Sequence, residues 1–130
     1  MIVNMTPHPV MIIDQAGNVI KRFETAGQIR LASQTVTGKP IEGIPTSKTV
    51  FGDAVGLPEE QGLCPRCMGT APMRLEACPD CGSEFVGHGK YYIVSQMVKS
   101  ALPGRRDLLV PAEVVRDSSG NIIGCRSLGR

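Results

Sequence analysis

The chain has 130 residues, enough for one domain and too few for two full ones. Hydrophobic residues make up 42% of it and aromatic residues 4%, and the formal net charge is +2, so the composition allows an aliphatic core and argues against general disorder. The longest apolar runs, residues 10–13 and 91–94, are far shorter than the roughly 20 residues of a membrane helix. The first run also lacks the basic residues that precede the apolar region of a signal peptide. We therefore expect a cytoplasmic protein with no membrane partner.

Glycine and proline punctuate the chain and argue against a helical bundle, since there are 15 glycines and 10 prolines. Between them lie short apolar or alternating stretches typical of strands. The expected strands are residues 2–4, 10–13, 19–23, 29–37, 91–94 and 108–110, followed by a hairpin over 114–123, with a broken extended stretch over 41–51. Ser95 is a suitable N-cap for a helix over 96–102. The predicted fold class is mainly β or α+β: a small antiparallel β domain with one short helix.

Two stretches share the pattern Asp-x-x-Gly-Asn followed by two β-branched residues, at 14–20 and 117–123. In such turns the aspartate bonds its own downstream backbone, and the Gly-Asn pair supplies positive-φ positions. We interpret them as hairpin turns that use the same chemistry, with a duplicated half-domain as the alternative.

Four of the five cysteines form the pattern C-x2-C-x10-C-x2-C: Cys64, Cys67, Cys78 and Cys81. Two residues between thiols let one tight turn direct both sulfurs to one point, and two such turns supply the tetrahedral sulfur ligands that zinc prefers. The pattern predicts a structural Zn²⁺ ion, with rubredoxin-like iron as the main competitor and disulfides disfavoured in a cytosolic chain. Glycine after the second cysteine is expected to take the positive φ of each turn.

Flexible or turn-like segments flank the cysteine pairs on both sides. We therefore expect an inserted zinc-ribbon-like subdomain over residues 62–89, within a β-rich host domain formed by residues 1–61 and 90–130. His88, between two glycines, is expected in an exposed loop. Cys125 is separate from the other cysteines and is expected to be a small buried hydrophobic residue.

Charge is unevenly distributed along the chain. From residue 62 to 89, two arginines face three acidic residues, and four thiolates with one Zn²⁺ bring this segment to a net charge of −3. Residues 99–130 carry six basic and three acidic side chains. Because phosphate contacts dominate nucleic-acid affinity, an acidic ribbon does not favour a nucleic-acid partner. The common catalytic motifs are also missing, so an enzyme is not favoured, although an unrecognised one remains an alternative.

The opening Asn4-Met5-Thr6-Pro7-His8-Pro9 resembles the Asn-Leu-Thr-Pro-His start of small proteins of bacteriophages, prophages and some actinobacteria. Further similar stretches are Gly43-Ile44-Pro45, Gly56-Leu57-Pro58, Tyr92–Ser95, and Arg116-Asp117 with Gly120, Ile123 and Gly124. The resemblance covers both ends, skips the cysteines, and departs at Met5, where leucine is usual. The family has no settled activity, but small phage proteins often act against bacterial immunity, some by sequestering nucleotide signals. The resemblance implies such a role in the bacterial host cytoplasm.

Two sets of residues are candidate ligand contacts. Asn4, Thr6 and His8 share one face of an extended segment, although they also suit capping of a turn. The second set consists of arginines, which suit phosphate or carboxylate if they converge: Arg105, Arg106, Arg116 and Arg126. For Arg105 and Arg106 the alternative is a solvated loop with an internal Arg–Asp pair.

These observations lead to two functional hypotheses. The first is a non-enzymatic binding protein that sequesters a small anionic, nucleotide-like ligand in counter-defence. The second is a zinc-ribbon protein-interaction module or a homo-oligomeric structural accessory protein. A small core and exposed strand edges favour homo-oligomerisation in either case.

Overall fold

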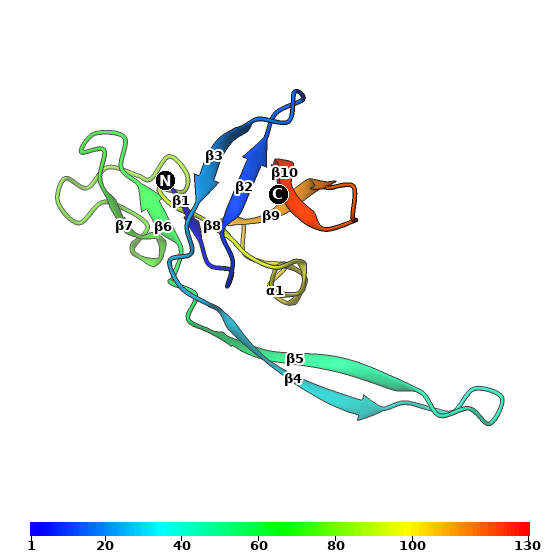
Figure 1. Ribbon diagram of the computed structural model, residues 1–130. Coiled ribbons are helices and arrows are strands. Elements are labelled where there is room, and N and C mark those ends of the chain that lie inside the picture. The colour runs from blue at the N-terminus through cyan, green and yellow to red at the C-terminus, as the bar shows by residue number, and fades with distance from the viewer.

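A computed structural model describes residues 1–130 as a β-rich body, a cysteine ribbon and a long two-stranded arm (Figure 1). The body contains a six-stranded sheet in the order β1-β8-β9-β10-β2-β3. Its strands are β1 (Ile2–Asn4), β2 (Val10–Ile13), β3 (Val19–Phe23), β8 (Tyr91–Ile93), β9 (Leu108–Arg116) and β10 (Ile122–Gly129). The single α-helix, α1 (Gln96–Ala101), connects β8 to β9. This β-rich architecture with one short helix confirms the predicted fold class.

The sheet is mixed, whereas the sequence predicted antiparallel pairing. β8 is parallel to both β1 and β9, and β10 is parallel to β2, while β9–β10 and β2–β3 are antiparallel hairpins. Parallel neighbours need long crossover connections. The segment with α1 supplies one between β8 and β9, and the arm and ribbon together occupy the connection from β3 to β8.

The two edges of the sheet meet at a single point. Asn4 at the end of β1 forms a parallel bridge with Thr25 just beyond β3, and the backbone N–H of Ala26 donates to the Asn4 carbonyl at 2.8 Å. The sheet therefore curls round on itself, and this bridge joins its two edge strands at one end.

The core lies on both sides of the β8–β9 pair. Tyr92 and Leu108 face α1, where they pack in one cluster with Val98, whereas Ile93 and Leu109 point the other way and pack with Val10 and Cys125. Alternating side chains of a strand point to opposite faces, and parallel strands are usually buried on both. As predicted, Ser95 caps α1: its hydroxyl accepts from the backbone N–H of Val98 at 3.3 Å.

The two Asp-x-x-Gly-Asn turns have the same structure and close the β2–β3 and β9–β10 hairpins. In each, the aspartate Oδ1 accepts from backbone N–H groups two and four residues later, at 2.9 and 2.8 Å for Asp14 and 2.9 and 3.0 Å for Asp117. Gly17 and Gly120 have φ of 88° and 85°, the left-handed region that favours glycine. The prediction of two like hairpin turns is confirmed, but only the glycine of each Gly-Asn pair takes positive φ.

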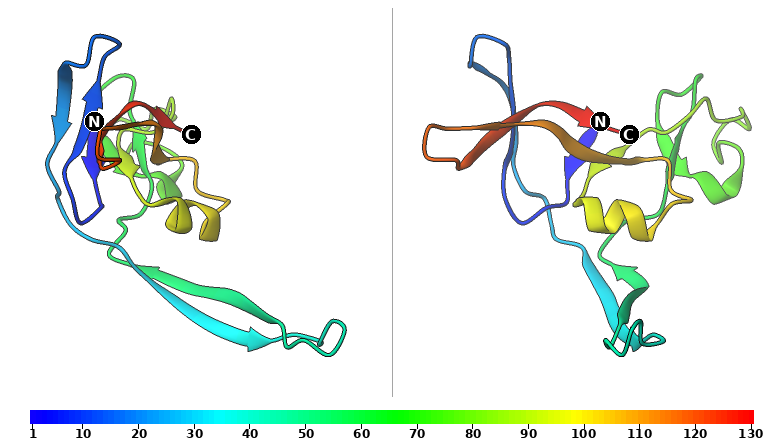
Figure 2. Two further views of the ribbon diagram at one scale, coloured as in Figure 1. Left: turned by 45° about the vertical axis from the view of Figure 1, so that its right-hand side comes forward. Right: turned by 90° about the vertical axis from the view of Figure 1, so that its right-hand side faces the viewer.

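The arm is formed by β4 (Arg30–Thr37) and β5 (Ser47–Val55), which pair only with each other. It projects away from the body in all three views (Figures 1 and 2). Most of its side chains are exposed, and an irregularity between the Leu31–Ala54 and Ser33–Phe51 pairs adds one residue to β5. The sequence predicted β4 closely, but it placed the extended stretch at 41–51 and did not predict a projecting hairpin.

The ribbon begins with the two-stranded sheet of β6 (Gln61–Leu63) and β7 (Thr70–Pro72) and continues through a 3-10 turn, η1 (Met73–Leu75). A bridge between Gly62 and His88 returns the chain to the start of the ribbon. The ribbon is thus one structural unit whose two ends lie side by side.

No helix of the structure has the length and apolar character that crossing a membrane requires.

Candidate metal centre

The two cysteine pairs lie in equivalent turns, Cys64–Gly69 and Cys78–Ser83. In each, the first cysteine's carbonyl accepts from the N–H four residues later, at 2.9 Å in the first turn and 2.8 Å in the second. The N–H of the first cysteine donates to the carbonyl five residues later, at 2.9 Å in both. The shared spacing therefore produces the same backbone twice, and each turn directs two thiols to one side.

The four sulfurs converge. The ligand atoms of Cys64, Cys67, Cys78 and Cys81 all lie within 4.8 Å of one another, and Cys64 Sγ is 3.5 Å from Cys81 Sγ. The backbone N–H of Cys67 donates to Cys64 Sγ at 3.2 Å, which stabilises negative charge on that sulfur. All five cysteines are free thiols. The cluster can hold a metal ion, and its four predicted ligands are confirmed as neighbours.

Crowding gives the thiols of the cluster different acidities. Hydrogen bonds from Ser83 lower the pKa of Cys81 to about 6, because they stabilise the thiolate. Hydrogen bonds with the sulfurs of Cys81 and Cys64 raise the pKa of Cys67 to about 12. Four thiolates so close together repel one another, so a bound cation is needed for all of them to ionise.

The residue after the second cysteine takes the left-handed conformation in both turns. Gly82 has φ of 75°, as predicted, but in the first turn Met68 has φ of 59° and Gly69 is not in this region. A methionine there carries a steric cost from its Cβ that glycine avoids. The expectation that glycine fills this position is correct for one turn and wrong for the other.

This difference in φ predicts that two glycine-to-alanine changes affect metal affinity differently. Gly82→Ala should weaken metal binding by about 1 kcal/mol, or roughly fivefold, because alanine is strained at positive φ although nothing lies within 4 Å of the new Cβ. Gly69→Ala, also with open space, is the matched control and should leave affinity unchanged or slightly improved. Competition with a chromogenic chelator measures both, and equal losses would contradict the assignment.

A charged cluster around Arg105 joins the ribbon to the body. The guanidinium forms a bidentate pair with Asp107, with Nε 2.8 Å from Oδ1 and Nη2 2.7 Å from Oδ2, and the Asp107 side chain is 0% exposed. Arg105 Nη2 also donates to the Pro58 carbonyl at 2.9 Å, and its Nε lies 3.6 Å from Glu60 Oε1. Asp107 and Glu60 raise the pKa of Arg105 against the opposing effect of burial. The expected alternative, an internal Arg–Asp pair in a solvated loop, is correct for the pair, but Asp107 is fully buried and Arg105 is 21% exposed.

His88 borders this cluster next to Glu60. Its side chain is 14% exposed, and its Nε2 is 3.6 Å from Glu60 Oε1 and has no hydrogen-bond partner. The expectation of an exposed loop is therefore wrong for this side chain. The bridge to Gly62 turns it inward, which the flanking glycines did not reveal.

The other predicted arginines do not gather with Arg105. Arg116 Nη1 donates to the Gly120 carbonyl at 2.9 Å, and Arg126 Nη1 donates to the Asp14 carbonyl at 3.0 Å, so each supports one of the two hairpin turns. Arg106 is exposed, and its backbone N–H contacts Glu60. Arg105 precedes β9 and Arg116 ends it, so a strand about 30 Å long separates them. The condition for an anion site, that Arg116 and Arg126 converge with Arg105 or Arg106, is therefore not met in this geometry.

The N-terminal polar residues hold a loop. Asn4 is 1% exposed; its Nδ2 donates to the carbonyls of His8 at 2.8 Å and Phe23 at 3.0 Å, and its Oδ1 accepts from the Thr6 N–H at 2.9 Å. The Thr6 hydroxyl donates to the His8 carbonyl at 2.8 Å. The amide of Asn4 is thus committed within the chain, whereas the His8 side chain stays exposed. These contacts are the turn-capping alternative of the sequence analysis.

Cys125 is buried between β2 and β9, 1% exposed, and burial raises the pKa of its thiol. We expect it to react slowly with a thiol reagent in the folded, metal-loaded protein, because the reagent needs an accessible thiolate. Chelation should release the four ribbon thiols first, and Cys125 should follow only on unfolding. Rapid modification of one thiol per chain before chelation, mapped to Cys125, would contradict this.

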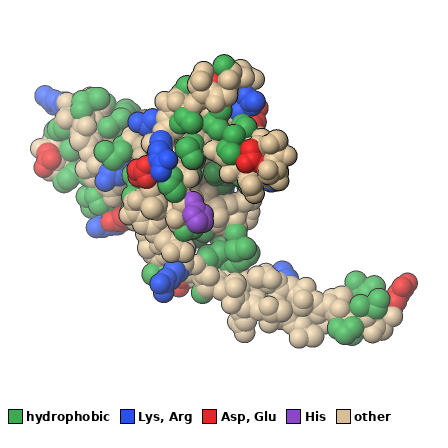
Figure 3. Space-filling view, in the orientation of Figure 1, with side chains coloured by type: hydrophobic (Ala, Val, Ile, Leu, Met, Phe, Trp, Pro, Cys, Tyr) green, Lys and Arg blue, Asp and Glu red, His purple; other side chains and the backbone are tan.

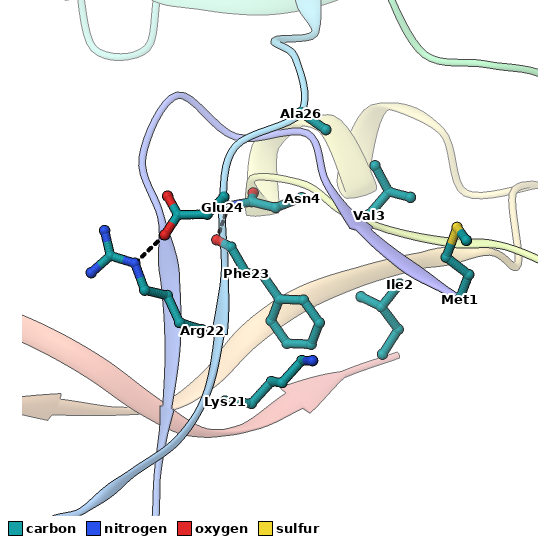
Figure 4. A pocket seen from close by; sticks show the side chains of 9 residues that line it. All are labelled: Met1, Ile2, Val3, Asn4, Lys21, Arg22, Phe23, Glu24 and Ala26. Carbon is teal, nitrogen blue, oxygen red and sulfur yellow. Dashed lines mark hydrogen bonds and ion pairs between the residues drawn. The ribbon is translucent and has the colours of Figure 1, made fainter.

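The largest cavity, about 720 Å³, opens where β1 and β3 diverge from the Asn4–Thr25 bridge (Figure 4). Its charged groups already have partners, since Arg22 pairs with Glu24 and Lys21 Nζ lies 5.6 Å from the Phe23 ring centroid. An anionic ligand would have to displace these contacts. The cavity therefore offers no ready anion site.

Comparison with known proteins adds no assignment to this geometry: the sequence matches no protein-family model and no curated protein, and the fold matches no solved structure.

Proposed function

We propose that the chain is a zinc-containing, non-enzymatic assembly protein that forms a homo-oligomer through its β4–β5 arm. The single observation that carries the proposal is the arm itself, whose strands pair only with each other and leave most of their side chains exposed. An isolated two-stranded hairpin is marginally stable in water, and a third strand, a helix or another packing surface is normally needed. A second copy of the chain supplies such a surface.

The size of the arm supports this role. Its nine-residue strand spans about 30 Å, so the arm reaches well beyond the body that carries it. Stable interfaces between two chains bury roughly 1,200–2,000 Å² in total, and exchange of two such arms between two chains is how we propose that this chain builds one. The apolar side chains along the arm, among them Val36 and Val50 at 45% exposure, then leave water.

Zinc is the proposed metal of the cysteine cluster, held by Cys64, Cys67, Cys78 and Cys81. Four sulfur ligands in two tight turns form the closed tetrahedral set typical of structural zinc sites. A closed set leaves no open position for a substrate, which supports a role in folding rather than in a reaction. The only buried hydrophobic residues of the ribbon are Cys64 and Cys78, so in our proposal the metal takes the place of a core.

The anion-binding hypothesis makes a different prediction, which a thermal-shift panel of mono-, di- and cyclic nucleotides tests. A ligand present at 100 times its dissociation constant adds about 2.7 kcal/mol of stability. We expect no shift, because Arg105, Arg116 and Arg126 already bond to groups of their own chain. A reproducible shift abolished by Arg106→Ala would favour the ligand hypothesis instead.

Shortening the arm tests the proposal directly. Residues 32–53 are replaced by Asn-Gly, which joins the paired residues Leu31 and Ala54 by a two-residue hairpin turn. We expect light scattering after size exclusion to find a multiple of the 13.9 kDa chain mass for the full protein and a monomer for the shortened one. Ile20→Ser, which removes an isoleucine 63% exposed outside the arm, is the control and should leave the mass unchanged. Equal oligomeric states with and without the arm would refute the proposal.

A further inference from the structure

The tip of the arm presents two isoleucines in a fixed arrangement. Ile41 and Ile44 are 67% and 64% exposed and bond to each other through both backbone groups, at 3.0 and 2.8 Å. Glu42 and Gly43 between them have φ of 50° and 79°, so the turn is tight. Residues paired in this way point to the same side, and the apolar side chains at the end of the arm are visible in Figure 3. The tip is therefore a preformed apolar surface.

A matching apolar groove lies on the body, between β2 and the β9–β10 hairpin. It encloses about 390 Å³, which is within the roughly 300–1,000 Å³ of pockets that bury a ligand. Its apolar walls include Val10, Val114, Ile122 and Ile123. Three of these are well exposed in the single chain: Val114 at 46%, Ile122 at 62% and Ile123 at 42%. We call this the β2–β10 groove.

We infer that the arm tip of one chain inserts Ile41 and Ile44 into the β2–β10 groove of a second copy. This inference rests on the proposed function and names the surface that receives the arm. The tip cannot fill its own groove, because the arm extends away from the body over about 30 Å (Figure 2). The occupant is a second copy because both surfaces are apolar, exposed and carried by every chain.

Charges at the two surfaces are complementary. Glu42 is exposed at the tip between the two isoleucines. At the groove, His8 forms part of the lining, and Arg116 lies opposite Ile122 across the β9–β10 pair. Glu42 at the tip and Arg116 beside the groove carry opposite charges, which favours this docking, whereas contact between two tips brings two Glu42 carboxylates together.

Photo-crosslinking tests where the tip docks. A photoreactive phenylalanine analogue replaces Ile44, and this chain is mixed with isotope-labelled chain without the analogue, so that only contacts between copies join light and heavy peptides. We expect light–heavy crosslinks to peptides that contain residues 8–11 or 111–125. The analogue at position 20, on an isoleucine of similar exposure, is the control and should give no such product.

Side-chain variants measure the strength of the same contact. Ile41→Ser with Ile44→Ser should raise the dissociation constant of the oligomer at least about 100-fold, and Ile122→Ser with Ile123→Ser should do the same. If the oligomer depends on the arm but the crosslinks map to another arm or to the β1–β3 cavity, the groove is wrong and the proposed function stands. If the full chain is a monomer, both fail.

Discussion

Changing Cys81→Ser should weaken zinc binding roughly 100-fold and, at low free zinc, unfold the ribbon while the body stays folded. Structural zinc sites contribute about 10–16 kcal/mol of binding free energy, so loss of one ligand among four costs roughly 3 kcal/mol, or two orders of magnitude in affinity. The ribbon has no other core, whereas the body is held by its own clusters around β8 and β9. Two-dimensional amide NMR should show loss of dispersion for residues 62–89 alone.

The control for this variant lies in the first cysteine turn. Arg66→Ala removes an exposed side chain next to the ligands and should leave both zinc affinity and the spectrum unchanged. Chelation of the unmodified protein should reproduce the spectrum of Cys81→Ser. Collapse of the signals of Ile93 and Leu109 in either case would contradict a separable ribbon.

Arg105→Ala should destabilise the whole protein by about 3–5 kcal/mol, because it leaves the Asp107 carboxylate buried without a partner. For a chain of this size such a loss lowers the melting temperature by roughly 10 °C or more. The neighbouring Arg106→Ala removes an exposed arginine and should change stability by less than about 0.5 kcal/mol. Differential scanning calorimetry measures both.

A double variant separates the pair from other functions of Arg105. Arg105→Ala combined with Asp107→Leu removes both charges and should recover most of the lost stability, because a buried ion pair is weakly stabilising as a whole. A double variant as unstable as Arg105→Ala alone would show that other contacts of Arg105, with Pro58 and Glu60, carry the effect.

Local features of this fold were predictable because their causes are local in sequence. The strands Val10–Ile13 and Val19–Phe23 match the structure, since an Asp-x-x-Gly-Asn turn defines the hairpin between them. The N-cap at Ser95 and the two cysteine turns follow from contacts within a few residues. The four metal ligands were found for the same reason: the pattern of two tight turns is complete without the rest of the chain.

Features that depend on contacts distant in sequence were not predictable. β8 pairs with β1 and β9 because the intervening segments bring these strands side by side. Hydrophobic patterns do not indicate the direction in which neighbouring strands run. Arg105 was misjudged because its contacts with Pro58 and Glu60 join segments that the whole ribbon separates in sequence. The arm was predicted only in part: β4 matches the expected strand over 29–37, but Gly52 and Asp53 interrupt the pattern of β5, and no local pattern indicates that the hairpin projects.

Native mass spectrometry of the full chain, purified without added metal, tests the account most directly, because one spectrum reports subunit number and bound metal together. We predict a defined oligomer of the 13.9 kDa chain with one zinc ion per subunit, and a zinc-loaded monomer once the arm is shortened. A full-length chain that is monomeric at micromolar concentration, or an oligomer that carries no metal, would contradict it.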